Sequence, residues 1–383
     1  MDSRQPPVLQ LILLTPLFPP DIGGPATYVE SVAHSFKEET ELSIIGFCEG
    51  KAAPIPGVKI KLVNPYELSF LGRQRWLWKT LQKTLKPQTF LYIQGPLVVG
   101  LVGVLFARWH RIPHALKFVG DLAWENASRY GKTHLNLEDW LKSRHKGFRP
   151  HLLYLIQKWN LHAAARILVP SQFLKDVLVQ HYHLPAVKVQ VLYNAYEGEL
   201  TTHAVQAQAH RLMSAGRLVP HKNMQGIMEA LKQLPEAFTL DIYGSGPEEE
   251  GLKNWTHHHG LDKRIRFHGH VTRETLLKAL DQHDLFILYS DYEGLPHSLL
   301  EAAARACPIL ASDIPGTREV ALAGLTAELC PPQNPTQLAK AIQRLSKDQK
   351  YRSLLVKNAQ EKLHTPFSWT AHRKGLEGLF FNR

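Results

Sequence analysis

The sequence alternates between short apolar runs and longer amphipathic stretches, and it repeats this plan in its two halves. The apolar runs are residues 8–14, 42–47, 90–93, 115–119 and 166–169, and then 211–215, 238–243, 265–268, 285–289 and 308–311. A near-continuous run such as Val8–Leu14 is typical of a strand buried on both faces of a parallel sheet. Strands that alternate with helices form parallel sheets covered by those helices. The pattern therefore predicts an α/β protein with two doubly wound, Rossmann-like parallel sheets.

The length of 383 residues suits two or three domains of roughly 150 residues each. Residues 194–210 are mostly small or polar and lack a strong periodicity, which indicates a linker between the two halves. We expect a first domain over residues 1–195 and a second over residues 196–363. Open α/β sheets bind ligands at the carboxyl ends of their strands, so we expect the site between the two sheets.

Composition excludes several classes of protein. Hydrophobic residues make up 44% of the chain and charged residues 21%, which is typical of a globular protein and excludes a disordered or fibrous one. The three cysteines are too few and too scattered for a disulfide framework, and they suit a reducing compartment. The longest uncharged apolar stretch, residues 96–107, is shorter than the ~20 residues that span a bilayer. We therefore expect a cytoplasmic protein, with peripheral attachment to the inner face of the cell membrane left open.

The positive charge is concentrated in the first half. Residues 51–149 hold 17 Lys/Arg against 5 Asp/Glu, whereas residues 196–383 are nearly balanced. Within the basic segment, Arg73, Arg75 and Lys79 alternate with Trp76 and Trp78. Residues 145–158 add a second group of cations and apolar residues, with Trp159 nearby: Lys146, Phe148, Arg149, Leu152 and Leu153. Cations beside aromatic residues suit an anionic membrane surface. The alternative is that the aromatic residues are core and the cations a solvated rim. No nucleic-acid motif accompanies this segment, so we expect no nucleic-acid partner.

The second half carries a pattern suited to binding phosphate. The segment Gly294–Ser298 follows the apolar run 285–289 and opens a helical stretch. Amide groups at a helix start are free to bind an anion, and the helix dipole favours it. Two carboxylates, Glu293 and Glu301, flank these amides and could bind the hydroxyl groups of a sugar and a ribose.

Two further loops follow apolar runs in this half. Arg217 and Lys222 come after the run 211–215 and are cations suited to a diphosphate. The turn Gly244-Ser-Gly246 comes after the run 238–243. Separately, these features would be a surface charge pair and an ordinary turn. Because all three loops leave one sheet at the same edge, together they predict a site for a nucleotide diphosphate-sugar.

These motifs resemble those of a known family. Arg217 with Lys222, the turn Gly244–Pro247, and Glu293-x7-Glu301 within Glu-Gly-Leu-Pro-x-Ser-Leu-Leu-Glu-Ala look like the donor-binding motifs of the family 4 (group 1) retaining glycosyltransferases, which have the GT-B fold. The resemblance extends to Gly23-Gly24, Val169-Pro-Ser171 and Leu192-Tyr-Asn194, so it spans nearly the whole chain.

The resemblance implies roles for individual residues. Residues matching Arg217 and Lys222 bind the donor diphosphate, the one matching Glu293 contacts the transferred sugar, and the one matching Glu301 binds the ribose. The loop at Gly23-Gly24 closes over the phosphates, and the last helix, expected within residues 364–383, packs back on the first domain. The expected catalytic set is Glu293, Arg217, Lys222 and Asp121. The expected substrate-binding set is Gly23, Gly24, Asn194, Gly244, Gly246, Gly294, Leu295, Pro296, His297, Ser298, Leu299 and Glu301.

The chain departs from the family pattern at two places. Many members carry His-Asp after the strand that ends here at Val119, with the His on the donor sugar, whereas this chain has Gly120-Asp121. Asp121 could therefore orient the acceptor or could be a structural helix cap. The Asn-Gly often found near the hinge is Asn194-Ala195 here.

The resemblance implies a retaining transfer of a sugar from a nucleotide diphosphate-sugar to an acceptor hydroxyl, without a metal or a cofactor. We expect a UDP-sugar in preference to a GDP-sugar. The expected acceptor is a glycan or a lipid-linked molecule in bacterial cell-surface polysaccharide or glycolipid assembly. A small soluble acceptor, a GT-B-like sugar-nucleotide epimerase and a binding module without catalysis remain as alternatives.

Overall fold

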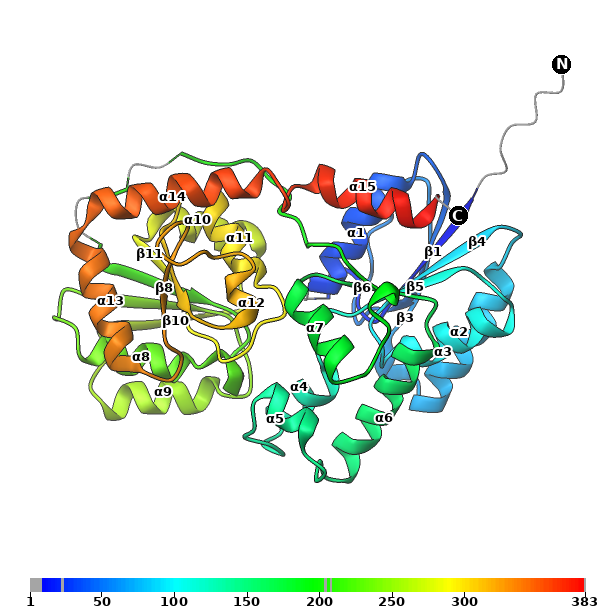
Figure 1. The fold of residues 1–383 in the computed structure, drawn as a ribbon, viewed down its shortest axis with the longest axis horizontal. Helices are drawn as coiled ribbons and strands as arrows, with labels where there is room; N and C mark the ends of the chain where they lie inside the picture. The colour runs from blue at the N-terminus through cyan, green and yellow to red at the C-terminus, as the bar shows by residue number, and fades with distance from the viewer. Residues whose placement is uncertain (1–8, 22–23, 203–204, 207–208, 382–383) are drawn as a thin grey trace, which may run out of the picture.

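The computed structural model describes residues 9–21, 24–202, 205–206 and 209–381. Figure 1 shows two lobes side by side, each built on one sheet with helices on both of its faces. The chain crosses from the first sheet to the second between Val191 and Arg211. No helix among these residues is both long and apolar enough to span a membrane.

The first lobe contains a seven-stranded parallel sheet in the order β3-β2-β1-β4-β5-β6-β7. Its strands are β1 (Gln10–Thr15), β2 (Glu41–Phe47), β3 (Val58–Val63), β4 (Thr89–Gln94), β5 (His114–Lys117), β6 (Arg166–Val169) and β7 (Val189–Val191). Its α-helices are α1 (Gly24–Phe36), α2 (Phe70–Thr84), α3 (Gly100–Trp109), α4 (Leu122–Arg129), α5 (Leu137–Lys142), α6 (Phe148–Ala163) and α7 (Gln172–Gln180).

The second lobe contains a six-stranded parallel sheet in the order β10-β9-β8-β11-β12-β13. Its strands are β8 (Arg211–Ala215), β9 (Thr239–Tyr243), β10 (Ile265–Gly269), β11 (Leu285–Leu288), β12 (Ile309–Ser312) and β13 (Glu328–Cys330). The α-helices after β8 are α8 (Met224–Lys232), α9 (Glu249–His258), α10 (Arg273–Gln282), α11 (His297–Ala304), α12 (Pro315–Arg318), α13 (Pro335–Lys347), α14 (Gln349–Leu363) and α15 (Trp369–Phe380). The predicted pair of doubly wound parallel sheets is confirmed.

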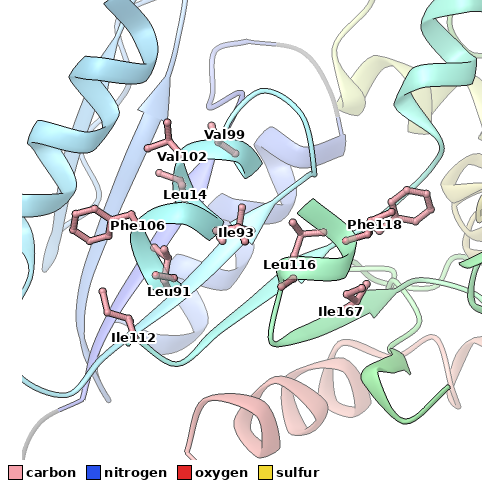
Figure 2. Close-up of a cluster of buried hydrophobic side chains, with 14 of the residues drawn as sticks. Leu14, Leu91, Ile93, Val99, Val102, Phe106, Ile112, Leu116, Phe118 and Ile167 are labelled. Carbon is pink, nitrogen blue, oxygen red and sulfur yellow. The ribbon is translucent and has the colours of Figure 1, made fainter. Parts of the chain in front are cut away.

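The apolar runs have a direct structural reason. In β1, Ile12 and Leu14 belong to the hydrophobic cluster on one face of the sheet, and Leu11 and Leu13 to the cluster on the other face. Successive side chains of a strand point to opposite faces, so a strand covered on both sides needs apolar residues at every position. Figure 2 shows the first of these clusters, in which residues of β4 and β5 pack against α3 and Ile167 of β6 continues the cluster beside Leu116.

Three strands were missing from the expectation, namely β3, β7 and β13. All three lie at sheet edges. The sequence of β3 is Val-Lys-Ile-Lys-Leu-Val, where Lys59 and Lys61 interrupt the apolar run, and β7 and β13 have three residues each. Short or lysine-bearing edge strands resist pairing with another chain, and for the same reason they lack a strong sequence signal.

The C-terminal helix α15 completes the core of the first lobe. Phe380 lies 5.3 Å from Phe36 of α1 and 5.4 Å from Phe90 of β4, measured between ring centroids. The Trp369 indole N–H donates to the Ser35 hydroxyl at 2.9 Å. In Figure 1, α15 follows α14 across the top of the molecule and lies over the first sheet beside α1. The domain borders expected at residues 195 and 363 stay predictions.

Replacement of Phe380 by Ala should lower the free energy of unfolding by about 3–5 kcal/mol, because it removes a ring that is 2% exposed and leaves a cavity. The neighbouring Phe381 is 39% exposed, so Phe381→Ala is a matched control that should cost less than about 1 kcal/mol. Urea denaturation measures both values. Equal losses would contradict the packing of α15 described here.

Candidate active site

The loops after β8 and β11 bring together two of the expected catalytic residues. Lys222 ends a short 3₁₀ turn after β8, and its ammonium group lies 2.6 Å from Oε1 of Glu293 in the loop after β11. The Ser290 hydroxyl donates to the same oxygen at 2.6 Å. Glu293 is only 7% exposed, so a buried carboxylate is matched by a cation and a hydroxyl donor. Parallel strands that end at one sheet edge make this meeting possible.

The loop that carries Arg217 is held in place by the expected glycine turn. The amide of Gly216 donates to the Tyr243 carbonyl at 3.0 Å, and the amide of Leu218 donates to the Ser245 carbonyl at 2.9 Å. A Cβ at Gly244 would lie 1.9 Å from the carbonyl oxygen of Gly216. The Gly244–Gly246 turn can therefore approach the Arg217 loop only because it lacks side chains at these positions.

The start of α11 leaves backbone donors without a side-chain partner. Pro296 is the N-cap residue, and among the described residues no side-chain hydrogen bond caps the helix. The first amides and the positive end of the helix dipole therefore remain to bind an anion. Leu295 and Leu299 are buried in the core of the second lobe, whereas His297 is exposed and Ser298 is partly exposed.

His297 begins α11, and its side chain is exposed. Partial loss of surrounding water, and secondly the charges of Lys117 and Arg273, lower the pKa of His297 below its ordinary value. The ring is therefore neutral near pH 7.

Glu301 lies within α11 and pairs with Arg273, which no sequence motif had indicated. Nε of Arg273, the first residue of α10, lies 2.9 Å from Oε1 of Glu301. Burial raises the pKa of Glu301, and the charge of Arg273 opposes this rise. The Arg273 guanidinium therefore orients this carboxylate.

Residues from both lobes meet beside these loops. Tyr292, next to Glu293, packs its ring 4.7 Å from that of Trp124 in α4, and its hydroxyl accepts from the Asp121 amide at 3.4 Å. A Cβ at Gly294 would lie 2.5 Å from the carbonyl oxygen of Val119 in the first lobe. The expected site therefore lies at the interface of the two lobes. In the sequence, the tyrosine directly before Glu293 was the one feature from which this contact between the lobes could have been predicted.

Asp121 is built into the fold of the first lobe. It is fully buried, and its Oδ1 accepts from the Trp124 amide at 2.9 Å as the N-cap of α4. Its Oδ2 accepts from the Tyr182 hydroxyl at 2.5 Å. These contacts are those of a structural helix cap, which was one of the two alternatives for Asp121. Its acceptor-orienting role stays a prediction.

The hinge residue Asn194 contacts a buried lysine. Lys117, the last residue of β5, is 3% exposed and donates to Oδ1 of Asn194 at 2.9 Å. Its ammonium group lies 3.0 Å from the ring centroid of Tyr28 in α1. Burial lowers the pKa of Lys117 well below its usual value. A lysine within the apolar run 115–119 was the sequence feature from which this buried contact could have been predicted.

The loop expected to close over the phosphates is described only in part. Gly24 is the first residue of α1, and Gly23 lies outside the described residues.

Two family models match the chain one after the other. The model described as Glycosyltransferase Family 4 matches residues 22–199, and the model described as Glycosyl transferases group 1 matches residues 203–362. The two matches together cover both lobes, and they agree with the family resemblance seen in the motifs.

Individual proteins are similar over different extents. A glycogen synthase of Mycobacterium tuberculosis is 25% identical over 59% of this chain and 57% of its own length. A lipopolysaccharide core biosynthesis glycosyltransferase of Rhizobium meliloti is 32% identical over 45% of this chain and 50% of its own length. This chain therefore spans about half to three-fifths of these curated relatives.

Among solved structures, HepE of Anabaena in complex with UDP covers 97% of this chain and 99% of its own, with a TM-score of 0.75 at 18% identity. This likeness concerns the fold, and it confirms the GT-B architecture expected from the sequence.

The close approach of the two loops can be tested with alanine. Gly244→Ala should lower the free energy of unfolding by at least about 1–3 kcal/mol, because φ is +129° there and a Cβ would overlap the Gly216 carbonyl. Gly251 in α9 has open space around it, so Gly251→Ala is the matched control and should stabilise by about 0.5–1 kcal/mol. Urea denaturation separates the two. Similar stabilities would mean that the turn does not hold the Arg217 loop.

Proposed function

Since this chain belongs to the family 4, group 1 glycosyltransferases, we propose that it transfers a sugar from a nucleotide diphosphate-sugar to an acceptor hydroxyl with retention of the anomeric configuration. One observation carries the proposal. The buried Lys222–Glu293 pair joins two strand-end loops of the second sheet: the loop after β8 also carries Arg217, and the loop after β11 leads into the start of α11. This arrangement offers two cations and backbone amides to a diphosphate, with a carboxylate beside them for the sugar.

The chemistry follows from where charge develops. As the glycosidic bond breaks, the leaving diphosphate gains negative charge and the sugar becomes oxocarbenium-like. Arg217, Lys222 and the first amides of α11 are preorganised to stabilise that negative charge. These groups take the place of a divalent metal ion, so the reaction proceeds without one. The acceptor hydroxyl attacks from the face of the leaving phosphate, which takes up its proton.

A UDP-sugar is the proposed donor, in preference to a GDP-sugar, and no further cofactor is needed. The support is the likeness to HepE of Anabaena, which has been solved with UDP and with UDP-glucose. The proposed acceptor is a glycan or lipid-linked molecule in bacterial cell-surface polysaccharide or glycolipid assembly. Its support is the group of relatives that includes lipopolysaccharide core and amylovoran biosynthesis glycosyltransferases.

Removal of either partner of the buried pair should abolish most of the transfer. We expect Glu293→Ala and Lys222→Ala each to lower the transfer rate at least about a hundredfold, as loss of one preorganised group does in other enzymes. Lys253 and Glu249 form an ion pair of the same 2.6 Å length on the surface of α9, so Lys253→Ala and Glu249→Ala are matched controls. Product formation from a panel of UDP-, GDP- and ADP-sugars provides the measurement.

The same assay in excess EDTA should give unchanged rates for the wild type. Loss of transfer on chelation, restored by manganese or magnesium, would contradict the metal-independent mechanism. Wild-type rates in the Glu293 and Lys222 variants would contradict the role of the pair.

The membrane part of the proposal rests on one of the two expected segments, residues 145–159, and not on Trp76 and Trp78. Trp78 packs 5.1 Å from Phe106, and Trp76 packs 6.3 Å from Phe47, both between ring centroids. These two tryptophans are partly buried against the core of the first lobe. They therefore agree with the alternative stated above, in which the aromatic residues belong to the core. They do not offer an apolar contact to a bilayer.

Helix α6 does offer such a contact. Phe148, Leu152, Leu155 and Trp159 are 86%, 48%, 46% and 42% exposed, and their spacing places them on one side of the helix. We call these four residues the α6 apolar face. The adjacent helix α3 adds Trp109, which is 78% exposed. Arg149 and Lys158 lie on α6 itself. An apolar face accompanied by cations suits insertion at the surface of an anionic membrane, where a lipid-linked acceptor would be reached.

Sedimentation with vesicles tests this surface. Wild-type protein should bind anionic vesicles at low salt, bind less as salt screens the cations, and bind neutral vesicles poorly. The double variant Phe148→Ser with Trp159→Ser should bind at least about tenfold more weakly. Leu354 of α14 is 50% exposed in the other lobe, so Leu354→Ser is the control and should bind normally.

The α2 cations form a separate arm of the same experiment. Replacement of Arg73, Arg75 and Lys79 by Gln should weaken vesicle binding, because about 1 kcal/mol of binding free energy is lost per cation near an anionic surface. The affinity for UDP should not change. Equal binding to anionic and neutral vesicles, or to neither, would overturn the membrane proposal and favour a soluble acceptor.

A further inference from the structure

Glu125 reaches the proposed diphosphate site from the opposite lobe. It lies in the first turn of α4, and its Oε2 is 3.1 Å from Nη2 of Arg217. The Glu125 side chain is 15% exposed and the Arg217 side chain 53% exposed. The guanidinium proposed to bind the donor is therefore paired with a carboxylate of the first lobe.

The glycine at position 120 makes this contact possible. A Cβ at Gly120 would lie 2.5 Å from Oε1 of Glu125 and 3.4 Å from the Tyr292 hydroxyl. Any side chain at position 120 would therefore displace the Glu125 carboxylate. The departure from the His-Asp pattern at Gly120-Asp121 thus has a physical consequence, which is the room that it leaves for Glu125.

The negative charge of Glu125 is compensated by the positive charges of Arg217 and Lys222. Burial raises the pKa of its carboxyl group, and the charges of Arg217 and Lys222 oppose that rise. Lys222 is in turn paired with Glu293. Both cations thus carry a carboxylate partner, one from each lobe. A nucleoside diphosphate that binds Arg217 brings several negative charges to the place where the Glu125 carboxylate lies, and like charges this close repel one another.

We propose that Glu125 is a positioning residue that competes with the nucleoside diphosphate for Arg217. It pairs with the guanidinium at the lobe interface, and the diphosphate must displace it in order to bind. After transfer, Glu125 recovers Arg217 and thereby favours release of the nucleoside diphosphate product. This inference rests on the proposed function, because it assumes that a nucleoside diphosphate is the ligand.

The test measures the affinity of the full chain for UDP, GDP and ADP by calorimetry, and carries the tightest of the three to the variants. Glu125→Gln keeps the shape of the side chain and removes its charge. We expect it to bind the nucleotide about two- to fivefold more tightly than the wild type, which is the range for loss of one partly exposed competing ion pair. A purely structural role would predict unchanged or weaker binding.

Three further variants separate the causes. Gly120→Ala keeps the charge but pushes the carboxylate away from Arg217, so it should also tighten binding. Glu138→Gln removes an exposed carboxylate of α5 that is paired with Lys142, and it controls for the general gain in positive charge. In an Arg217→Gln background, Glu125→Gln should no longer tighten binding, because the residue for which the two competed is absent.

The outcomes distinguish the two proposals. If the wild type binds none of the three nucleotides, the proposed function fails. If it binds one but Glu125→Gln and Gly120→Ala do not tighten binding, or if Glu138→Gln tightens it equally, the competition by Glu125 is overturned and the proposed function stands.

Discussion

The buried ion pair between Lys222 and Glu293 joins two loops whose residues are 71 positions apart in the chain. A carboxylate that is 7% exposed remains charged at little cost only if a cation and hydrogen-bond donors lie against it. That condition is met because β8 and β11 are neighbours in a parallel sheet and end at the same edge. The glycine turn after β9, the neighbour of β8 on its other side, then fixes the Arg217 loop beside this pair. The site is therefore a consequence of the strand order.

The second constraint is the contact between the lobes. Tyr292 extends from the Glu293 loop into the apolar cluster around Trp124, and Glu125 extends in the opposite direction to Arg217. The aromatic contact is held by packing, whereas the ion pair involves an Arg217 side chain that is about half exposed. Such a pair has little net strength and can be exchanged for another anion. The two lobes thus share an aromatic packing contact at Tyr292 and a weaker, exchangeable ion pair at Arg217. Both contacts lie beside the residues proposed to bind the donor.

The sequence predicted buried strands far better than edge strands. The segment Leu11–Leu14 is apolar at each position because both faces of β1 are covered. By contrast, β3 has lysines at alternate positions and one weakly buried face, and β7 and β13 are too short for any period to appear. For the candidate site, the sequence selected residues that stand beside glycine or at helix starts. It did not select Arg273, because an arginine at the start of an exposed helix has no local feature that distinguishes it.

The sequence by itself determined the two parallel sheets and the loops that carry Arg217, Lys222 and Glu293, since periodicity, glycine position and helix starts are local properties of the chain. Only the tertiary structure decided the partners of those residues. The pairing of Arg217 with Glu125 depends on how two lobes meet, and the burial of Trp76 and Trp78 depends on how α2 rotates against the core. Contacts between segments far apart in the chain are set by packing of whole elements, and no local pattern records them.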